Sequence, residues 1–199
     1  MTEETETTKG ERTRQAIVDA AHDVILEKGY HAASMRQIAK QAGIAVGGIY
    51  NHFESKEDIF AAIVLKRHPY KRILPLALAA GGEDVETFAH NTGLAIANEL
   101  RDNPDFVNLL FIEIVEFRGK HMAQIFQDIF PQVLPILERF QAGNARNIPP
   151  MMLMRIFIGT FIAYFLTEVS FGEAVMPELQ ENSMHHFVDV FLHGVLEKE

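Results

Sequence analysis

The chain has 199 residues, no cysteine and a formal net charge of −9, and 48% of its residues are hydrophobic. That apolar content can bury a substantial core, and the absence of cysteine excludes a disulfide framework, a thiol nucleophile and cysteine-ligated zinc. Residues 1–10 are polar and mostly acidic rather than basic and then apolar. We therefore expect a disordered tail there, no secretory signal and a cytoplasmic protein.

Charge is distributed unevenly along the chain. Residues 9–72 carry 11 basic against 7 acidic side chains, whereas residues 73–199 carry 7 against 17. Because phosphate neutralisation supplies most non-specific affinity for DNA, a basic head on an acidic body favours docking on DNA through the head. The alternative is that these charges only solvate the surface.

The first three predicted helices form one motif. An amphipathic helix covers residues 13–28, and a second begins at Ser34, because Ser34 and Gln37 have the S-x-x-Q spacing of a capping box. Gly43 ends the second helix, and a short turn leads to a third over residues 46–53. About two turns of helix are not stable alone, so neighbouring helices must hold them. This arrangement predicts a helix-turn-helix motif that displays its last helix to DNA.

A family pattern runs through this motif. It consists of Ile38-Ala39, Ala42-Gly43-Ile44, Gly47, Ile49-Tyr50, Phe53 and Ser55-Lys56-Glu57. In these residues the segment 13–65 resembles the DNA-binding domain of the TetR family of bacterial repressors. The resemblance implies an all-α fold, with an N-terminal three-helix helix-turn-helix DNA-binding domain followed by a helical ligand-binding and dimerisation domain. Ala45 and Val46 stand where the family usually has a small hydroxyl residue and often a basic residue, so two family contacts to DNA are absent.

Further helices follow the motif. An S-x-x-D capping box at Ser55 starts a helix that runs towards Pro69, and Pro69 and Pro75 should bend or break the chain between residues 66 and 80. We place the domain boundary there. The predicted domains are the tail (1–10), the DNA-binding domain (11–66) and a helical effector-binding and dimerisation domain (67–199).

The second predicted domain consists of five helices, over residues 84–101, 104–117, 119–141, 150–171 and 183–196. Pro131 and Pro135 should kink or split the third of them. The fourth is the most apolar, but its uncharged interval, 156–167, falls short of the roughly 20 residues that span a bilayer, so we expect no membrane span. Glu113 falls within the apolar stripe of its helix, where an ionised carboxylate needs a cationic or hydrogen-bonding partner.

Candidate DNA contacts follow from position on the motif, because the second helix reads base edges in the major groove and its surroundings contact phosphates. The candidates are Arg36, Val46, Gly47, Gly48, Tyr50, Asn51, His52 and Lys56. The amide of Asn51 can bind adenine bidentately, whereas Lys56 and Arg36 are phosphate candidates. By resemblance to the family, Tyr50 and His52 contact phosphate or sugar. The alternative for each residue is simple solvation of a helical bundle.

The helix over residues 150–171 has two unlike faces. We assign the face of small residues, with a seam on the last helix, to a two-fold homodimer interface, since a dimer matches a palindromic operator. The interface candidates are Met152, Ile156, Gly159, Ala163, Thr167, Phe187, Phe191 and Val195. The alternative is packing within one chain.

The opposite, aromatic face can line a cavity for an apolar effector, as the resemblance to a ligand-releasing repressor family implies. The pocket candidates are Phe88, His90, Asn91, Leu110, Phe111, Glu113, Phe117, Met122, Phe126, Phe157, Phe161, Tyr164 and Phe165. The polar members of this set would orient the ligand. Core packing is the alternative for each of them.

Neither catalysis nor a cofactor is expected, because the sequence has no Gly-rich phosphate loop, nucleophile elbow or HExxH motif. His121, His185 and His186 invite a metal interpretation. Adjacent histidines point to different helix faces, however, and no third ligand sits at a motif spacing, so no metal site is predicted.

We therefore expect a transcription regulator, in particular a repressor released from a palindromic DNA operator by a small apolar effector. The alternative is a DNA-binding scaffold that a protein partner regulates, with no small-molecule effector.

Overall fold

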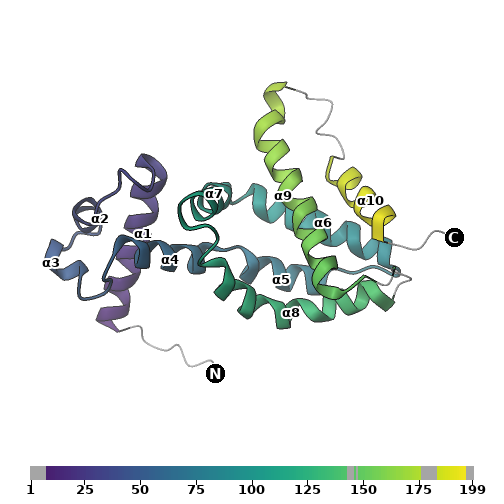
Figure 1. The fold of residues 1–199 in the computed structure, drawn as a ribbon, viewed down its shortest axis with the longest axis horizontal. Helices are drawn as coiled ribbons and strands as arrows, with labels where there is room; N and C mark the ends of the chain where they lie inside the picture. The colour runs from purple at the N-terminus through teal and green to yellow at the C-terminus, as the bar shows by residue number, and fades with distance from the viewer. Residues whose placement is uncertain (1–7, 143–145, 147, 176–182, 196–199) are drawn as a thin grey trace. The chain divides into compact units, whose positions relative to one another are not determined.

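The computed structural model describes residues 8–142, 146, 148–175 and 183–195. Every regular element in these ranges is an α-helix, which confirms the predicted all-α fold (Figure 1). The chain divides into two compact units. Unit 1 comprises Met1–His68 and Asn108–Ala123, and unit 2 comprises Pro69–Val107 and Gln124–Glu199.

Unit 1 contains four helices and most of a fifth. These are α1 (Lys9–Lys28), α2 (Met35–Gln41), α3 (Val46–Ile49), α4 (Lys56–Arg67) and the later part of α7 (Asp105–Phe117). Helix α1 packs against both α2 and α4, and α2 packs against α3. Their fully buried side chains are Ile17, Ala21, Ile25, Ile38, Ala39, Ile49, Ile59, Phe60 and Ile63. Burial of these apolar groups holds the four short helices together.

Helix α1 begins at Lys9, which lies within the segment expected to be a disordered tail. Thr8 is its N-cap: the Thr8 hydroxyl accepts a hydrogen bond from the Glu11 N–H at 3.2 Å, and the Glu11 carboxylate accepts one from the Thr8 N–H at 2.7 Å. This is the same kind of capping box that predicted α2, where the structure shows the reciprocal Ser34–Gln37 bonds. The rest of the predicted tail, residues 1–7, lies outside the described residues.

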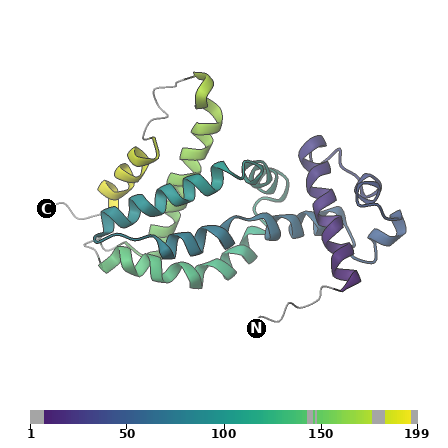
Figure 2. The same cartoon turned by 180° about the vertical axis from the view of Figure 1, so that it is seen from behind.

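Unit 2 is a layered helical bundle. Its helices are α5 (Tyr70–Ala79), α6 (Val85–Arg101), most of α8 (Met122–Ala142), α9 (Pro150–Val175) and α10 (Ser183–Val195). Figure 2 shows α6 between α5 and α10, with α9 crossing the layer. The core is formed by apolar side chains from all five helices, including Leu74, Phe88, Ile96, Leu137, Leu153 and Phe191.

The prolines have less effect than predicted. The chain breaks between α4 and α5, at His68 and Pro69, as the sequence suggests. Pro75 lies inside α5, however, and Pro131 and Pro135 lie inside α8, which remains one helix (Figure 1). Proline has a helical φ and removes one backbone hydrogen bond, so burial of the neighbouring apolar residues Ile136 and Leu137 can offset the loss.

The partner that Glu113 requires is His121. The Glu113 side chain is fully buried, and its carboxylate accepts a hydrogen bond from the His121 backbone N–H and contacts the His121 ring Nδ1, each at 2.7 Å. A turn with positive φ at Arg118 and Gly119 brings His121 back to the end of α7. The carboxylate therefore fixes the turn that follows α7.

We expect Glu113→Ala to lower the free energy of unfolding by about 2 kcal/mol, because the His121 groups lose a charged acceptor in a buried site. Chemical denaturation measures this. Glu138→Ala, at an exposed position of α8, is the control and should be neutral. Equal stabilities for the two variants would contradict the assignment.

Candidate DNA-binding surface

The turn between α2 and α3 is a Schellman motif. The Ile44 N–H donates to the Ala39 carbonyl at 3.0 Å, and the Gly43 N–H donates to the Lys40 carbonyl at 3.2 Å. Gly43 has φ +71°, a conformation that glycine adopts without steric cost. This closed turn fixes the direction in which the chain enters α3.

Helix α3 is shorter than predicted, because only Val46–Ile49 is α-helical. Hydrogen-bonded turns continue the winding: the Ile49 carbonyl accepts from the N–H groups of His52 and Phe53, each at 3.0 Å. Ile49 and Phe53 are buried, and Arg14 of α1 lies 4.6 Å from the Phe53 ring centroid. Two buried side chains thus hold a segment that could not form a helix alone.

The outward side of this segment is exposed. Val46 and Tyr50 expose 42% and 54% of their surface, and Gly47, Asn51 and the α2 residue Arg36 are also exposed. Gly48 and His52 are half-buried. The motif therefore brings the α3 candidates onto one continuous stretch, with an amide, a phenol and open backbone available to a ligand.

Gly47 and Gly48 face open space. A Cβ atom added at either position would meet no atom within 4 Å. Packing within the chain therefore does not require glycine at either position.

Lys56 has partners inside the unit. Its ammonium donates to the Tyr30 and Ala33 carbonyls at 2.5 and 2.7 Å and lies 4.3 Å from the Tyr30 ring centroid. Burial lowers the pKa of Lys56, with Glu116 acting in the opposite direction. This ammonium, predicted to bind phosphate, instead joins the loop after α1 to the start of α4.

The sequence reasoning missed a contact between the residues around the end of α7 and the helix-turn-helix motif. The Phe117 ring stacks on Phe60 at 4.9 Å and meets Tyr30 edge-on at 5.0 Å. Nearby, Lys120 pairs with Glu57 at 2.6 Å, and Glu116 pairs with His31 at 2.6 Å. Only the odd position of Glu113 in an apolar stripe hinted at a special role for this segment.

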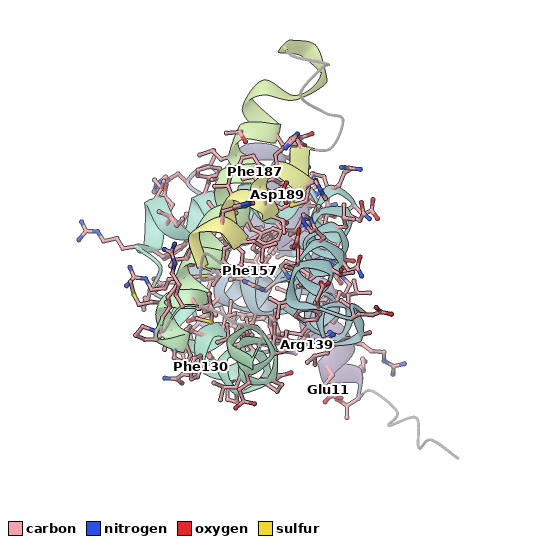
Figure 3. The ribbon with its side chains drawn as sticks, turned by 90° about the vertical axis from the view of Figure 1, so that its right-hand side faces the viewer. Glu11, Phe130, Arg139, Phe157, Phe187 and Asp189 are labelled. Atoms are coloured by element: carbon pink, nitrogen blue, oxygen red, sulfur yellow. The ribbon has the colours of Figure 1, made fainter. Side chains whose placement is uncertain are left out.

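The homodimer candidates fall into two groups. All five α9 candidates are exposed in the single chain. On α10, Phe187 is half-buried (labelled in Figure 3). Phe191 is in the core of unit 2, where it meets Phe157 edge-on at 5.5 Å. The Val195 side chain lies outside the described residues. The chain itself thus accounts for the burial of Phe191.

The effector-pocket candidates are divided between the two units. Leu110, Phe111, Glu113, Phe117 and Met122 belong to unit 1, and the other eight belong to unit 2. Within unit 2, Phe88, Phe161 and Tyr164 are buried core residues, whereas Phe126 is exposed. Asn91 donates to the Gly81 carbonyl at 2.6 Å. These placements leave the pocket assignment a prediction.

Taken together, a closed turn, an anchored and exposed α3 and three supporting helices define a helix-turn-helix DNA-binding domain, and the chain is a transcription regulator of that class. The model of the tetR family of bacterial regulatory proteins matches residues 17–63. Over 191 residues, 92% of this chain and 97% of the relative, the chain is 24% identical to YvkB, an uncharacterized HTH-type transcriptional regulator of Bacillus subtilis (strain 168).

Other relatives match either a short part of the chain in sequence or nearly the whole chain in fold. A stretch of 63 residues, 31% of this chain and 30% of the relative, is 44% identical to the HTH-type transcriptional repressor BepR of Brucella suis biovar 1 (strain 1330). A solved tetR-family transcription regulator from Shewanella sp. PV-4 aligns with a TM-score of 0.72 at 20% identity, covering 94% of this chain and 99% of that one. The match over residues 17–63 identifies a DNA-binding domain of the TetR family, and the rest of the chain is similar in fold to regulators of that family.

For Lys56→Met we expect a loss of about 2 kcal/mol in the free energy of unfolding, because two carbonyls lose a charged donor. The salt dependence of DNA affinity should be the same for Lys56→Met as for the unmodified protein. Binding of the Arg36→Ala protein to DNA should release about one counterion fewer. Thermal unfolding and DNA titrations at several salt concentrations measure the two effects. If Lys56→Met is as stable as the unmodified protein and its DNA affinity depends less on salt, Lys56 binds a DNA phosphate as the sequence predicted.

Proposed function

We propose that the chain is a homodimeric transcriptional repressor that binds a palindromic DNA operator through α3 and is released by a small, largely apolar effector. The observation that carries DNA binding is the exposed stretch from Val46 to Asn51, fixed from beneath by Ile49 and Phe53. Its setting in a helix-turn-helix motif of the TetR family supports the same conclusion. A cytoplasmic location and a non-enzymatic role follow from this function.

Within the proposed complex, the start of α3 enters the major groove. The open backbone at Gly47 and Gly48 approaches the DNA closely, and the exposed Asn51 amide is positioned to read one base. Tyr50 and His52 contact phosphate or sugar, and Arg36 contacts phosphate. Lys56 supports this surface from inside by fixing the loop after α1.

Dimerisation is supported by the exposed apolar side of α9. By length and composition alone, the stretch Pro150–Glu168 is apolar enough to cross a membrane, with a mean hydropathy of 1.5. Only 22% of this stretch is buried in the single chain, so most of it is exposed. Met152, Ile156 and Leu166 are 46%, 41% and 44% exposed. An exposed apolar surface of this kind marks an interaction site. A second copy of the chain is the partner that fits best, because a two-fold dimer matches palindromic DNA.

The α10 side of this interface is better assigned to an exposed residue than to Phe191. Val190 is 75% exposed, whereas Phe191 is 5% exposed. We therefore add Val190 to the proposed dimer surface and keep Phe191 as a core residue that supports it.

The effector is supported by the family resemblance and by the aromatic interior of unit 2, where Phe157, Phe161 and Tyr164 lie along α9. An effector can release DNA only if it binds two conformations of the dimer with different affinity. The alternative, a scaffold regulated by a protein partner, needs no such interior site. A thermal shift with apolar ligands that also dissociates the operator would favour the effector.

Asn51→Ala tests the proposed reader. We expect affinity for a selected operator to fall by about 1–3 kcal/mol, with preference relaxed at one base position of each half-site. Affinity for random duplex DNA should not change, and the fold should be unaffected because Asn51 is exposed. Equal losses on operator and random DNA would remove Asn51 as a reader.

Ile156→Asp tests the dimer. An aspartate in the α9 face should make the chain monomeric in light scattering at micromolar concentration and abolish tight operator binding, because a charge would be buried without a partner. Leu94→Asp, on α6, is the matched control, since Leu94 is 48% exposed and Ile156 is 41% exposed. A dimeric Ile156→Asp protein, or a monomeric unmodified protein, would contradict the interface.

A further inference from the structure

Helices α6 and α10 bring together three side chains with metal-binding chemistry. His185 and Asp189 are four residues apart and lie on one side of α10, and His90 comes from α6. One ligand atom from each, an imidazole nitrogen or a carboxylate oxygen, can be chosen so that all three lie within 4.8 Å of one another. Figure 3 labels Asp189 on α10.

The local packing explains how these residues meet. A Cβ added to Gly93 would lie 2.6 Å from a methyl of Val188, so the glycine allows α10 to approach α6 closely. His90 lies about one turn before Gly93, and Asp189 follows Val188. The three side chains therefore lie near a close approach of the two helices.

The contacts at this point form a compact set. The His90 Nε2 atom lies 3.0 Å from Asp189 Oδ1, and the His185 Nε2 atom lies 3.9 Å from Asp189 Oδ2. The two imidazole rings stack with centroids 3.9 Å apart. Both rings thus present a nitrogen to the same carboxylate.

His90 also carries an uncompensated polar atom. Its side chain is 13% exposed, and its buried Nδ1 atom has no hydrogen-bond partner among the residues that the structure describes. A buried ring nitrogen without a partner costs free energy, and a bound ion is one explanation for such an atom in a folded protein. Coordination of a metal through Nδ1 would give this atom a partner, whereas the Nε2 atom already faces Asp189.

We propose that His90, His185 and Asp189 form a site for a divalent transition-metal ion, with Zn²⁺ as the best match. Two imidazoles and one carboxylate are ligands that zinc accepts, whereas magnesium and calcium prefer oxygen alone. Zinc bonds of about 2.0–2.2 Å require the three ligand atoms to lie closer than they do here, which rotation of the partly exposed His185 ring can achieve.

Such a site has three protein ligands and an open fourth position for water or another donor. Because its ligands come from α6 and α10, bound metal would tie these helices together. The sequence predicted no metal site at His121, His185 and His186, because adjacent histidines point to different helix faces and no third ligand sits at a motif spacing. Asp189, four residues after His185, was not considered as a ligand, and His90 lies 95 positions before His185.

The direct test is metal binding by the tag-free full-length protein after removal of metal with a chelator. Titration with Zn²⁺ in a calorimeter should show one site per chain, and Co²⁺ should give the visible absorption of a four-coordinate ion. His185→Asn is the main variant, because the His185 side chain is 54% exposed and its loss should not affect folding without metal. We expect it to weaken Zn²⁺ binding at least 100-fold.

His186→Asn is the matched control, since His186 is the exposed neighbour on another side of α10 and should leave Zn²⁺ affinity unchanged. Asp189→Asn should weaken binding as His185→Asn does. Zn²⁺ should raise the unfolding temperature of the unmodified and His186→Asn proteins but not that of the His185→Asn and Asp189→Asn proteins. Absence of Zn²⁺ binding, or equal affinity in the unmodified, His185→Asn and Asp189→Asn proteins, would overturn the proposal. In that case the three side chains would form only an ion pair and a ring stack.

Discussion

The display of α3 depends on the burial of Ile49 and Phe53. A helix of one turn followed by hydrogen-bonded turns has too little internal stability to persist in water. Both side chains are nonetheless almost inaccessible, and the Ile49 carbonyl accepts two hydrogen bonds from the residues after it. One side of the segment from Val46 to Phe53 therefore packs into the core of unit 1, and the other side is exposed. Such a segment is already folded before any ligand binds to its exposed side.

Contacts that are remote in sequence support this core. Lys56 reaches back to the carbonyls of Tyr30 and Ala33, and Phe117 stacks on Phe60 from a segment more than fifty residues later. Glu113 and His121 fix the turn that follows Phe117. The stability of the DNA-binding head therefore depends on residues that the sequence assigns to the second domain, a link that gives the later segment influence over the head.

Local signals could be predicted well, and remote ones could not. The capping box at Ser34, the side-chain cap at Ser55 and the glycine after α2 act within a few residues, so their patterns identify the helix ends directly. The Thr8–Glu11 box was overlooked because it lies in a polar tail. Position alone placed Lys56 at a phosphate, since no sequence pattern reports that three carbonyls lie within its reach.

The second unit shows the same division. Apolar spacing predicts α6, α8, α9 and α10 but not α5, which lies in the stretch that was expected to bend or break. The five candidates on the small-residue face of α9 are exposed in the single chain. The burial of Phe191 and the meeting of His90 with Asp189 depend on how three helices pack, which the sequence does not encode at a readable spacing. Whether α8 continues through Pro131 and Pro135 likewise depends on whether burial of nearby apolar residues offsets the lost backbone hydrogen bonds.

The most direct test of sequence-specific binding through α3 is selection of the purified protein on random duplex DNA near physiological salt, with sequencing of the retained duplexes. We predict an enriched inverted repeat whose half-sites are one helical turn, or a multiple of it, apart. Loss of that enrichment when Ile49 is replaced by Asp would tie it to the anchored helix. Failure of folded, ligand-stripped protein to enrich any sequence would contradict the account.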